Sequence, residues 1–225
     1  GRQARLDHSH VVLASRTLAE IDAAAAAIRA EGGHAEPLRL DVTDLSAVRA
    51  AIGSLPPFQV LVNNAGTNRP RPFLDVTEDD YDTIATLNQR AAFFVAQAVA
   101  RTMVGAGKRG SIIHMSSQMG HVGGALRTVY CSSKHAIEGL TKAMAIDLAP
   151  HGIRVNALGP TYIDTPLTRP YWNDGAFHHE VLRKIKLGRL GTVEELMGAV
   201  VFLASDASAL MTGAALLVDG GWTAE

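Results

Sequence analysis

The chain has 225 residues, of which 47% are hydrophobic and 19% are charged, a composition typical of one globular domain rather than a disordered chain. Its formal net charge of -1 provides no basic surface for nucleic acid or an anionic membrane, so we expect a small-molecule substrate. The one cysteine, Cys131, excludes an intrachain disulfide, which favours a cytoplasmic location, and the longest apolar stretch, 91–104, is too short to span a membrane.

Short β-rich runs alternate with longer helical patterns, which is typical of a Rossmann-like α/β fold with a doubly wound parallel sheet. In chain order, we predict a strand at 11–14, a helix at 17–31, a strand at 35–40, a helix at 45–53, a strand at 58–62, a helix at 78–104, a strand at 111–115, a helix at 128–149, a strand at 153–158, a helix at 193–204 and a strand at 214–218. The long connection at 164–191 has no clear strand pattern, and we expect it to cover the ligand crevice.

Two helix starts carry a capping pattern. Thr77 precedes Asp80 by three positions, and Thr192 precedes Glu195 by the same interval. A hydroxyl residue followed three positions later by an acidic residue predicts a capping box at each site.

The most specific chemical feature is a tyrosine and a lysine four residues apart in a helical pattern. Tyr130 and Lys134 would lie on one helix face, where the ammonium favours the phenolate and lowers the tyrosine pKa from about 10. Ser117 ends the preceding strand and could donate a hydrogen bond to the same substrate oxygen. This arrangement predicts acid-base chemistry on an oxygen atom.

Further segments around this pair resemble the short-chain dehydrogenase/reductase family, in the same order, from residue 11 to the C-terminus. The matching segments are Asp41-Val42, Asn63-Asn64-Ala65-Gly66, Asn88, Ser117, Tyr130 to Lys134, 159–165, 188–191, 202–206 and 218–222. The resemblance implies hydride transfer between a nicotinamide cofactor and a carbonyl or secondary alcohol.

The resemblance also implies a role for each catalytic residue. Tyr130 would be the acid-base, Lys134 would lower its pKa and hold the nicotinamide ribose, and Ser117 would orient the substrate oxygen. Asn88 would hold a water molecule that links Lys134 to solvent, which completes a proton relay from Tyr130 through the ribose hydroxyl.

The end of the first predicted strand favours NADP over NAD. An acidic residue there would bind the ribose 2′-hydroxyl and repel a phosphate, whereas Ser15 and Arg16 suit a 2′-phosphate. NAD remains the alternative cofactor. The other cofactor-binding residues that the resemblance implies are Asp41, Val42, Asn64, Ala65, Gly66, Tyr130, Lys134, Pro160, Ile163 and Thr165. Thr161 stands where the family has a glycine, which reduces loop freedom without removing these contacts.

Polar and aromatic residues near the serine and in the connection 164–191 suit a sugar, polyol or sugar acid better than a hydrocarbon chain. The candidate substrate residues near the serine are Ser117, Gln118, His121 and Arg127. Those in the connection are Arg169, Tyr171, Trp172, His178 and His179. For most residues of both sets, lid surface or subunit contacts are the alternative role. A 3-oxoacyl thioester reductase remains the alternative activity.

The resemblance implies a homodimer or homotetramer, because the long helices at 78–104 and 128–149 form the usual subunit interface in the family. No catalytic metal is expected. His178 and His179 are adjacent, so on a helix they point about 100° apart rather than converging on one ion.

The beginning of the chain departs from the family pattern. Members start with a buried strand and a glycine-rich turn that cradles the pyrophosphate, and nothing before Val11 supplies them, although Gly1 could end the turn and 4–6 could be a helix remnant. In this topology the strand lies between those at 11–14 and 58–62, so we expect two unpaired edges inside the sheet. The chain is then an oxidoreductase whose first segment is absent from this sequence, or a non-catalytic homologue acting as an oligomer partner. We favour the oxidoreductase, because its Ser-Tyr-Lys-Asn set is complete.

Overall fold

Parallel strands alternate with helices along the chain. The computed structural model describes residues 9–166, 168–169, 172 and 175–224. The strands are β1 His10–Ser15, β2 His34–Arg39, β3 Val60–Asn63, β4 Gly110–Met115, β5 Ile153–Pro160 and β6 Ala215–Val218. The helices are α1 Leu18–Ala30, α2 Leu45–Ser54, α3 Glu78–Ala85, α4 Ala92–Gly105, α5 Thr128–Leu148, α6 Gly175–Lys184 and α7 Glu194–Ala204. The predicted strands are confirmed, as are the predicted helices except the continuous one at 78–104, and the α/β fold class with them.

The strands form two separate parallel sheets. One contains β1 and β2, and the other has the order β3-β4-β5-β6. Within the described residues, β1 pairs only with β2, and the outer edge of β3 has no neighbouring strand. The two open edges that the sequence predicted, beside the strands at 11–14 and 58–62, are therefore confirmed.

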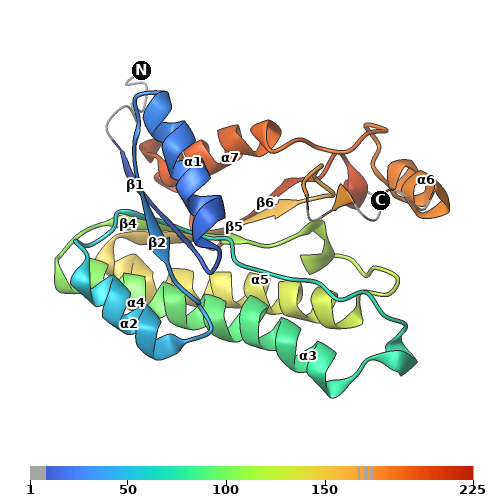
Figure 1. The fold of residues 1–225 in the computed structure, drawn as a ribbon, viewed down its shortest axis with the longest axis horizontal. Helices are drawn as coiled ribbons and strands as arrows, with labels where there is room; N and C mark the ends of the chain where they lie inside the picture. The colour runs from blue at the N-terminus through green and yellow to red at the C-terminus, as the bar shows by residue number, and fades with distance from the viewer. Residues whose placement is uncertain (1–8, 167, 170–171, 173–174, 225) are drawn as a thin grey trace.

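Helices cover both faces of the strands (Figure 1): α1 and α7 lie on one side, and α2 to α5 lie on the other. One buried cluster contains Leu40, Val48 and Ile52 from the region of β2 and α2, together with Val99 of α4 and Ile112 of β4. This cluster contains side chains from the regions of both sheets. The layer formed by α2 to α5 therefore joins the two sheets into one core. The continuous burial of β4 and β5 is typical of parallel strands covered on both faces.

The structure differs from the predicted helices in two places. The predicted helix at 78–104 contains a π-helical turn, Thr86–Ala91, between α3 and α4. The connection 164–191 contains α6, whose Val181 packs with Ile185 and Trp222 in a buried cluster. Its two histidines and its first glycine are weak helix formers, so packing rather than propensity accounts for this helix.

The two predicted capping boxes differ in outcome. Thr77 and Asp80 form the full reciprocal box at the start of α3. At the start of α7, Glu195 accepts a hydrogen bond from the backbone N–H of Thr192, but Val193 is the capping residue and makes no side-chain cap. The carboxylate of Glu195 pairs instead with Arg189.

The parallel arrangement brings the carboxyl ends of the strands, and the loops that follow them, to one edge of each sheet. Ser15 ends β1, Asn64 follows β3, Ser117 follows β4 and Pro160 ends β5. In the part of the chain that the structure describes, no helix is both long and apolar enough to cross a membrane.

Candidate active site

The first turns of α5 carry the predicted tyrosine and lysine. Tyr130 and Lys134 lie one turn apart, and the Nζ of Lys134 is 5.5 Å from the centre of the Tyr130 ring. Lys134 is 7% exposed and donates a 2.7 Å hydrogen bond to the carbonyl oxygen of Met115. Because Met115 ends β4, the lysine ties α5 to the strand that leads into Ser117.

Burial controls the charge state of both groups. It raises the pKa of the Tyr130 phenol above 10.0, while a hydrogen bond with Ser117 and the charge of Arg127 oppose that rise. It lowers the pKa of Lys134 to about 8, and the Glu138 carboxylate opposes that fall. The expected net lowering of the tyrosine pKa is therefore wrong here, because burial outweighs the hydrogen bond with Ser117 and the charge of Arg127. At neutral pH the phenol is protonated beside a charged ammonium, which suits proton donation.

Ser117 is held by the short helical turn that it begins. It is 5% exposed, its Oγ accepts a hydrogen bond from the N–H of Met119, and it donates to Oε1 of Gln118 at 2.7 Å. Gln118 was expected to contact substrate, but it is 2% exposed and contacts the serine hydroxyl. Its side chain therefore orients Ser117.

Asn88 lies in the π-helical turn and is buried. Its Oδ1 accepts a 2.8 Å hydrogen bond from the N–H of Thr67, and its Nδ2 donates to the carbonyl of Thr67 and to Oγ of Ser133. Such turns are common at functional sites because they change which side chains face inward. Here the turn joins Asn88 to both the loop after β3 and α5.

Gly66 lies where the asparagine and the lysine approach the loop after β3. A Cβ atom added at Gly66 would lie 3.4 Å from Oδ1 of Asn88 and 3.9 Å from Nζ of Lys134. The backbone of the Asn64-Ala65-Gly66 segment therefore lies against both predicted relay residues, while its outer surface is exposed.

A buried carboxylate lies one turn beyond the lysine. Glu138 is 7% exposed, and its Oε1 is 3.3 Å from Nε2 of His121. His121 was expected to face substrate, and the structure pairs it with this carboxylate. A Cβ atom at Gly120 would lie 3.2 Å from Oε1 of Glu138 and 2.8 Å from Oγ of Ser116, so only glycine fits between the serine segment and α5.

Two buried residues near the site, Glu138 and His114, were not predicted from the sequence. Glu138 follows Lys134 by four residues, the spacing of neighbours on one helix face, so this signal was available. His114 is buried on β4, and burial followed by the charge of Lys134 lowers its pKa to about 4. This histidine is therefore neutral and adds no second charge beside the lysine.

Arg127 lies at the start of α5 and is 4% exposed. Its guanidinium carbon is 6.0 Å from the centre of the Phe177 ring, which belongs to α6. Arg127 therefore joins the first turn of α5 to the connection after β5.

Aromatic residues of the connection pack against Tyr162 before it and Trp222 near the C-terminus. Tyr162 lies edge-on to Trp172 and Phe177 and is 5.7 Å from Trp222. His178 lies beside Trp172, and Arg169 forms an ion pair with Asp164. His179 is exposed, and Tyr171 lies outside the described residues, as do Gly1 and 4–6. Much of the predicted lid is thus an aromatic cluster.

The predicted adenine-side residues gather beyond the carboxyl ends of β1 and β2. The Arg16 side chain is 71% exposed, and its Nη1 is 3.9 Å from Oδ2 of Asp41. Asp41 accepts two hydrogen bonds from Thr43, which lower its pKa. Ser15 accepts a hydrogen bond from a neighbouring N–H, and Val42 is half-buried. An exposed guanidinium here is available to an anion.

The predicted nicotinamide-side residues follow β5. Pro160 ends the strand, Ile163 is buried and bridges to Gly191, and Thr165 bonds to Thr168. The Thr161 hydroxyl is buried, with no hydrogen-bond partner among the described residues. An unpartnered buried hydroxyl is unfavourable, so a polar group of a ligand would stabilise it.

Cys131 follows the tyrosine but is separate from this chemistry. It is half-buried. Burial raises the pKa of its thiol, so the less reactive thiol form predominates at neutral pH.

A family model and a relative of named activity match most of this chain. A family model described as enoyl-(acyl carrier protein) reductase matches residues 3–223. The L-xylulose reductase of Bos taurus is 40% identical over 216 residues, which cover 96% of this chain and 87% of that protein.

Two solved structures extend the comparison. A short-chain type dehydrogenase/reductase from Mycobacterium marinum has a TM-score of 0.91 and 40% identity, covering 96% of this chain and 86% of its own. A gluconate 5-dehydrogenase from Burkholderia cenocepacia, in complex with NADP and tartrate, has a TM-score of 0.91 and 37% identity. That match covers 96% of this chain and 86% of the dehydrogenase.

Proposed function

The chain belongs to the short-chain dehydrogenase/reductase family, and we propose that it is an NADP-dependent oxidoreductase acting on a sugar, polyol or sugar acid. The observation that carries this proposal is the convergence of Ser117, Tyr130, Lys134 and Asn88. All four side chains are held by α5, by the end of β4 or by the π-helical turn.

The residues on the cofactor side fit a dinucleotide. The exposed Arg16, with no acidic residue at the end of β1, suits a 2′-phosphate. The Thr161 hydroxyl, which has no partner in the described part of the chain, and the exposed Asn64-Ala65-Gly66 segment suit its nicotinamide and ribose ends. A related dehydrogenase of known structure binds NADP, which supports NADP ahead of NAD.

The dinucleotide supplies a hydride in reduction and accepts one in oxidation. In reduction, Ser117 and Tyr130 hold the substrate carbonyl oxygen, and Tyr130 donates its phenolic proton as that oxygen gains charge. The Ser117 hydroxyl must turn from Gln118 toward the substrate to make this bond. The Lys134 ammonium then stabilises the phenolate.

The proposed substrate class rests on the surroundings of Arg127. This buried cation and the aromatic cluster near it combine a charge with flat apolar faces, which suits a hydroxylated substrate. Relatives named for L-xylulose and gluconate support the same class over a 3-oxoacyl thioester.

We also propose one domain, a cytoplasmic location and a homodimer or homotetramer. The subunit proposal is supported by exposed apolar side chains on the two long helices, such as Phe93 on α4 and Ile146 on α5. Exposed apolar surface of this kind is typical of protein interfaces.

A substrate panel tests the function. The protein is incubated with NADPH and, separately, a ketopentose, a keto sugar acid and a 3-oxoacyl thioester, and NADPH absorbance is followed. We expect oxidation with a sugar or sugar acid. Faster turnover of the thioester would replace the proposed substrate class, and no turnover with any carbonyl would contradict the proposed activity.

A further inference from the structure

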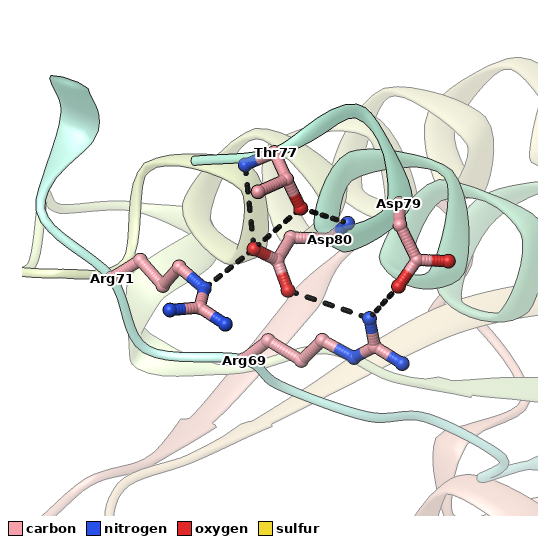
Figure 2. Close-up of polar contacts among 5 residues, drawn as sticks. All are labelled: Arg69, Arg71, Thr77, Asp79 and Asp80. Carbon is pink, nitrogen blue, oxygen red and sulfur yellow. Dashed lines mark hydrogen bonds and ion pairs between the residues drawn. The ribbon is translucent and has the colours of Figure 1, made fainter. Parts of the chain in front are cut away.

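A buried carboxylate outside the proposed catalytic set joins two arginines to the start of α3. The Asp80 side chain is 5% exposed. Its Oδ2 accepts from Nε of Arg71 at 2.6 Å and from the Thr77 hydroxyl at 2.9 Å, and Arg69 reaches its other oxygen at 3.4 Å. Figure 2 shows both guanidinium groups pointing from the loop toward this carboxylate. Hydrogen bonds from Thr77 and Arg71 keep its pKa below the ordinary value.

The loop that carries the arginines needs this anchor. Pro70 and Pro72 alternate with Arg69 and Arg71, and proline has no N–H to donate. The loop can therefore form few backbone hydrogen bonds of its own. The backbone N–H of Arg71 instead donates a 3.0 Å hydrogen bond to another segment, at the carbonyl oxygen of Leu126.

Leu126 has an unusual backbone conformation. Its φ is +60°, and among the described residues no other non-glycine residue has a positive φ. Its side chain does not explain this, because the residue is 48% exposed. A leucine in the left-handed region is strained and persists only where surrounding contacts impose it.

The strained residue immediately precedes the catalytic helix. Arg127 is the capping residue of α5, its carbonyl accepts a 2.7 Å hydrogen bond from the N–H of Cys131, and Tyr130 lies in this turn. A change in the backbone at Leu126 would move the first turn of α5 and the tyrosine with it.

We propose that Asp80 and Arg71 are positioning residues for Tyr130: their ion pair fixes the loop after β3, whose Arg71 N–H holds Leu126 in its left-handed conformation. The catalytic consequence rests on the proposed function, whereas the positioning of the α5 start does not. Arg69 is a weaker link in this path, because its guanidinium lies 2.5 Å from Asp79, whose side chain is 81% exposed, and 3.4 Å from Asp80.

The test compares two matched variants of one loop. Arg71→Met removes the ion pair with Asp80 and leaves the Thr77 cap intact. Arg69→Met is the matched control, because it makes the same side-chain change two residues earlier in the loop. We expect Arg71→Met to lower kcat roughly tenfold, as a small misplacement of a catalytic group does, with the KM for NADPH little changed. Arg69→Met should retain most of the wild-type kcat, because Arg71 still pairs with Asp80.

A rescue separates positioning from a general loss of stability. Glycine adopts a positive φ without strain, so Leu126→Gly in the Arg71→Met background should restore most of kcat. A merely destabilised protein would not recover in this way. Equal effects of the two arginine variants, or failure of the glycine to restore kcat, would overturn the proposal.

Amide hydrogen exchange provides a readout that needs no substrate. We expect Arg71→Met, but not Arg69→Met, to speed exchange in peptides that cover 126–131. If the wild-type protein turned over no carbonyl substrate, the proposed function would fail while this measurement still decided the positioning role. Unchanged exchange in Arg71→Met would refute it.

Discussion

The ammonium of Lys134 lies 5.5 Å from the centre of the Tyr130 ring, in a site that leaves the lysine only 7% exposed. The hydrogen bond to Met115 fixes the ammonium there. Burial has opposite effects on the two pKa values, since it raises that of the phenol and lowers that of the lysine to about 8. The lysine therefore opposes folding while it supports catalysis.

Replacing this lysine should stabilise the protein. A fall in the lysine pKa from 10.5 to about 8 corresponds to about 3 kcal/mol against the charged form in the folded state. We expect Lys134→Met to raise the thermal midpoint at pH 7, where the wild-type lysine is charged in both the folded and the unfolded state, and to abolish turnover.

The stability difference should depend on pH. Between about pH 8 and 10.5 the unfolded chain binds more protons than the folded protein, so wild-type stability rises with pH. The advantage of Lys134→Met should therefore be largest below pH 8 and shrink above it. A variant less stable than wild type at pH 7, with a difference independent of pH, would contradict this explanation.

Glu138 should set the alkaline limit of activity. Its carboxylate favours the charged form of Lys134, so Glu138→Gln should lower the lysine pKa further, and kcat should begin to fall at a lower pH than in wild type. The measurement is kcat against pH from neutral to alkaline conditions. Glu180→Gln is a matched control, because Glu180 pairs with Lys184 at the same helical spacing on the surface; a similar displacement in both variants would exclude the proposed role.

Arg16 should determine the cofactor preference. Its exposed guanidinium at the end of β1 is suited to a 2′-phosphate, and an acidic side chain there would repel the phosphate and bind a free hydroxyl. We expect Arg16→Asp to shift the ratio of kcat/KM for NADPH and NADH toward NADH by at least about tenfold. An unchanged ratio would show that the cofactor is selected elsewhere.

Local patterns predicted much of this structure. The spacing of Tyr130 and Lys134 gives their shared helix face directly, because helix geometry depends only on sequence separation. The two open sheet edges followed from the order of the strands, and the Thr77–Asp80 box from a three-residue interval. Each of these features depends on residues close together in the sequence, or on the strand order that the family resemblance implies.

Contacts between distant segments were not predictable in this way. The bond from Arg71 to Leu126 joins residues far apart in sequence, and the pairing of His121 with Glu138 depends on how α5 packs on the serine segment. The pKa of Tyr130 was misjudged because its burial, which outweighs the Ser117 hydrogen bond and the charge of Arg127, is a property of the whole fold.

The most direct test of the central claim is the turnover of Tyr130→Phe with NADPH and the best carbonyl substrate. This change removes the phenolic oxygen and keeps the ring, and Tyr81→Phe on the exposed surface of α3 serves as the matched control. We predict that kcat falls at least about 100-fold, as expected when a general acid is lost, while NADPH binding and the control variant are unaffected. Retention of most of the wild-type kcat by Tyr130→Phe would contradict the assignment of Tyr130 as the proton donor.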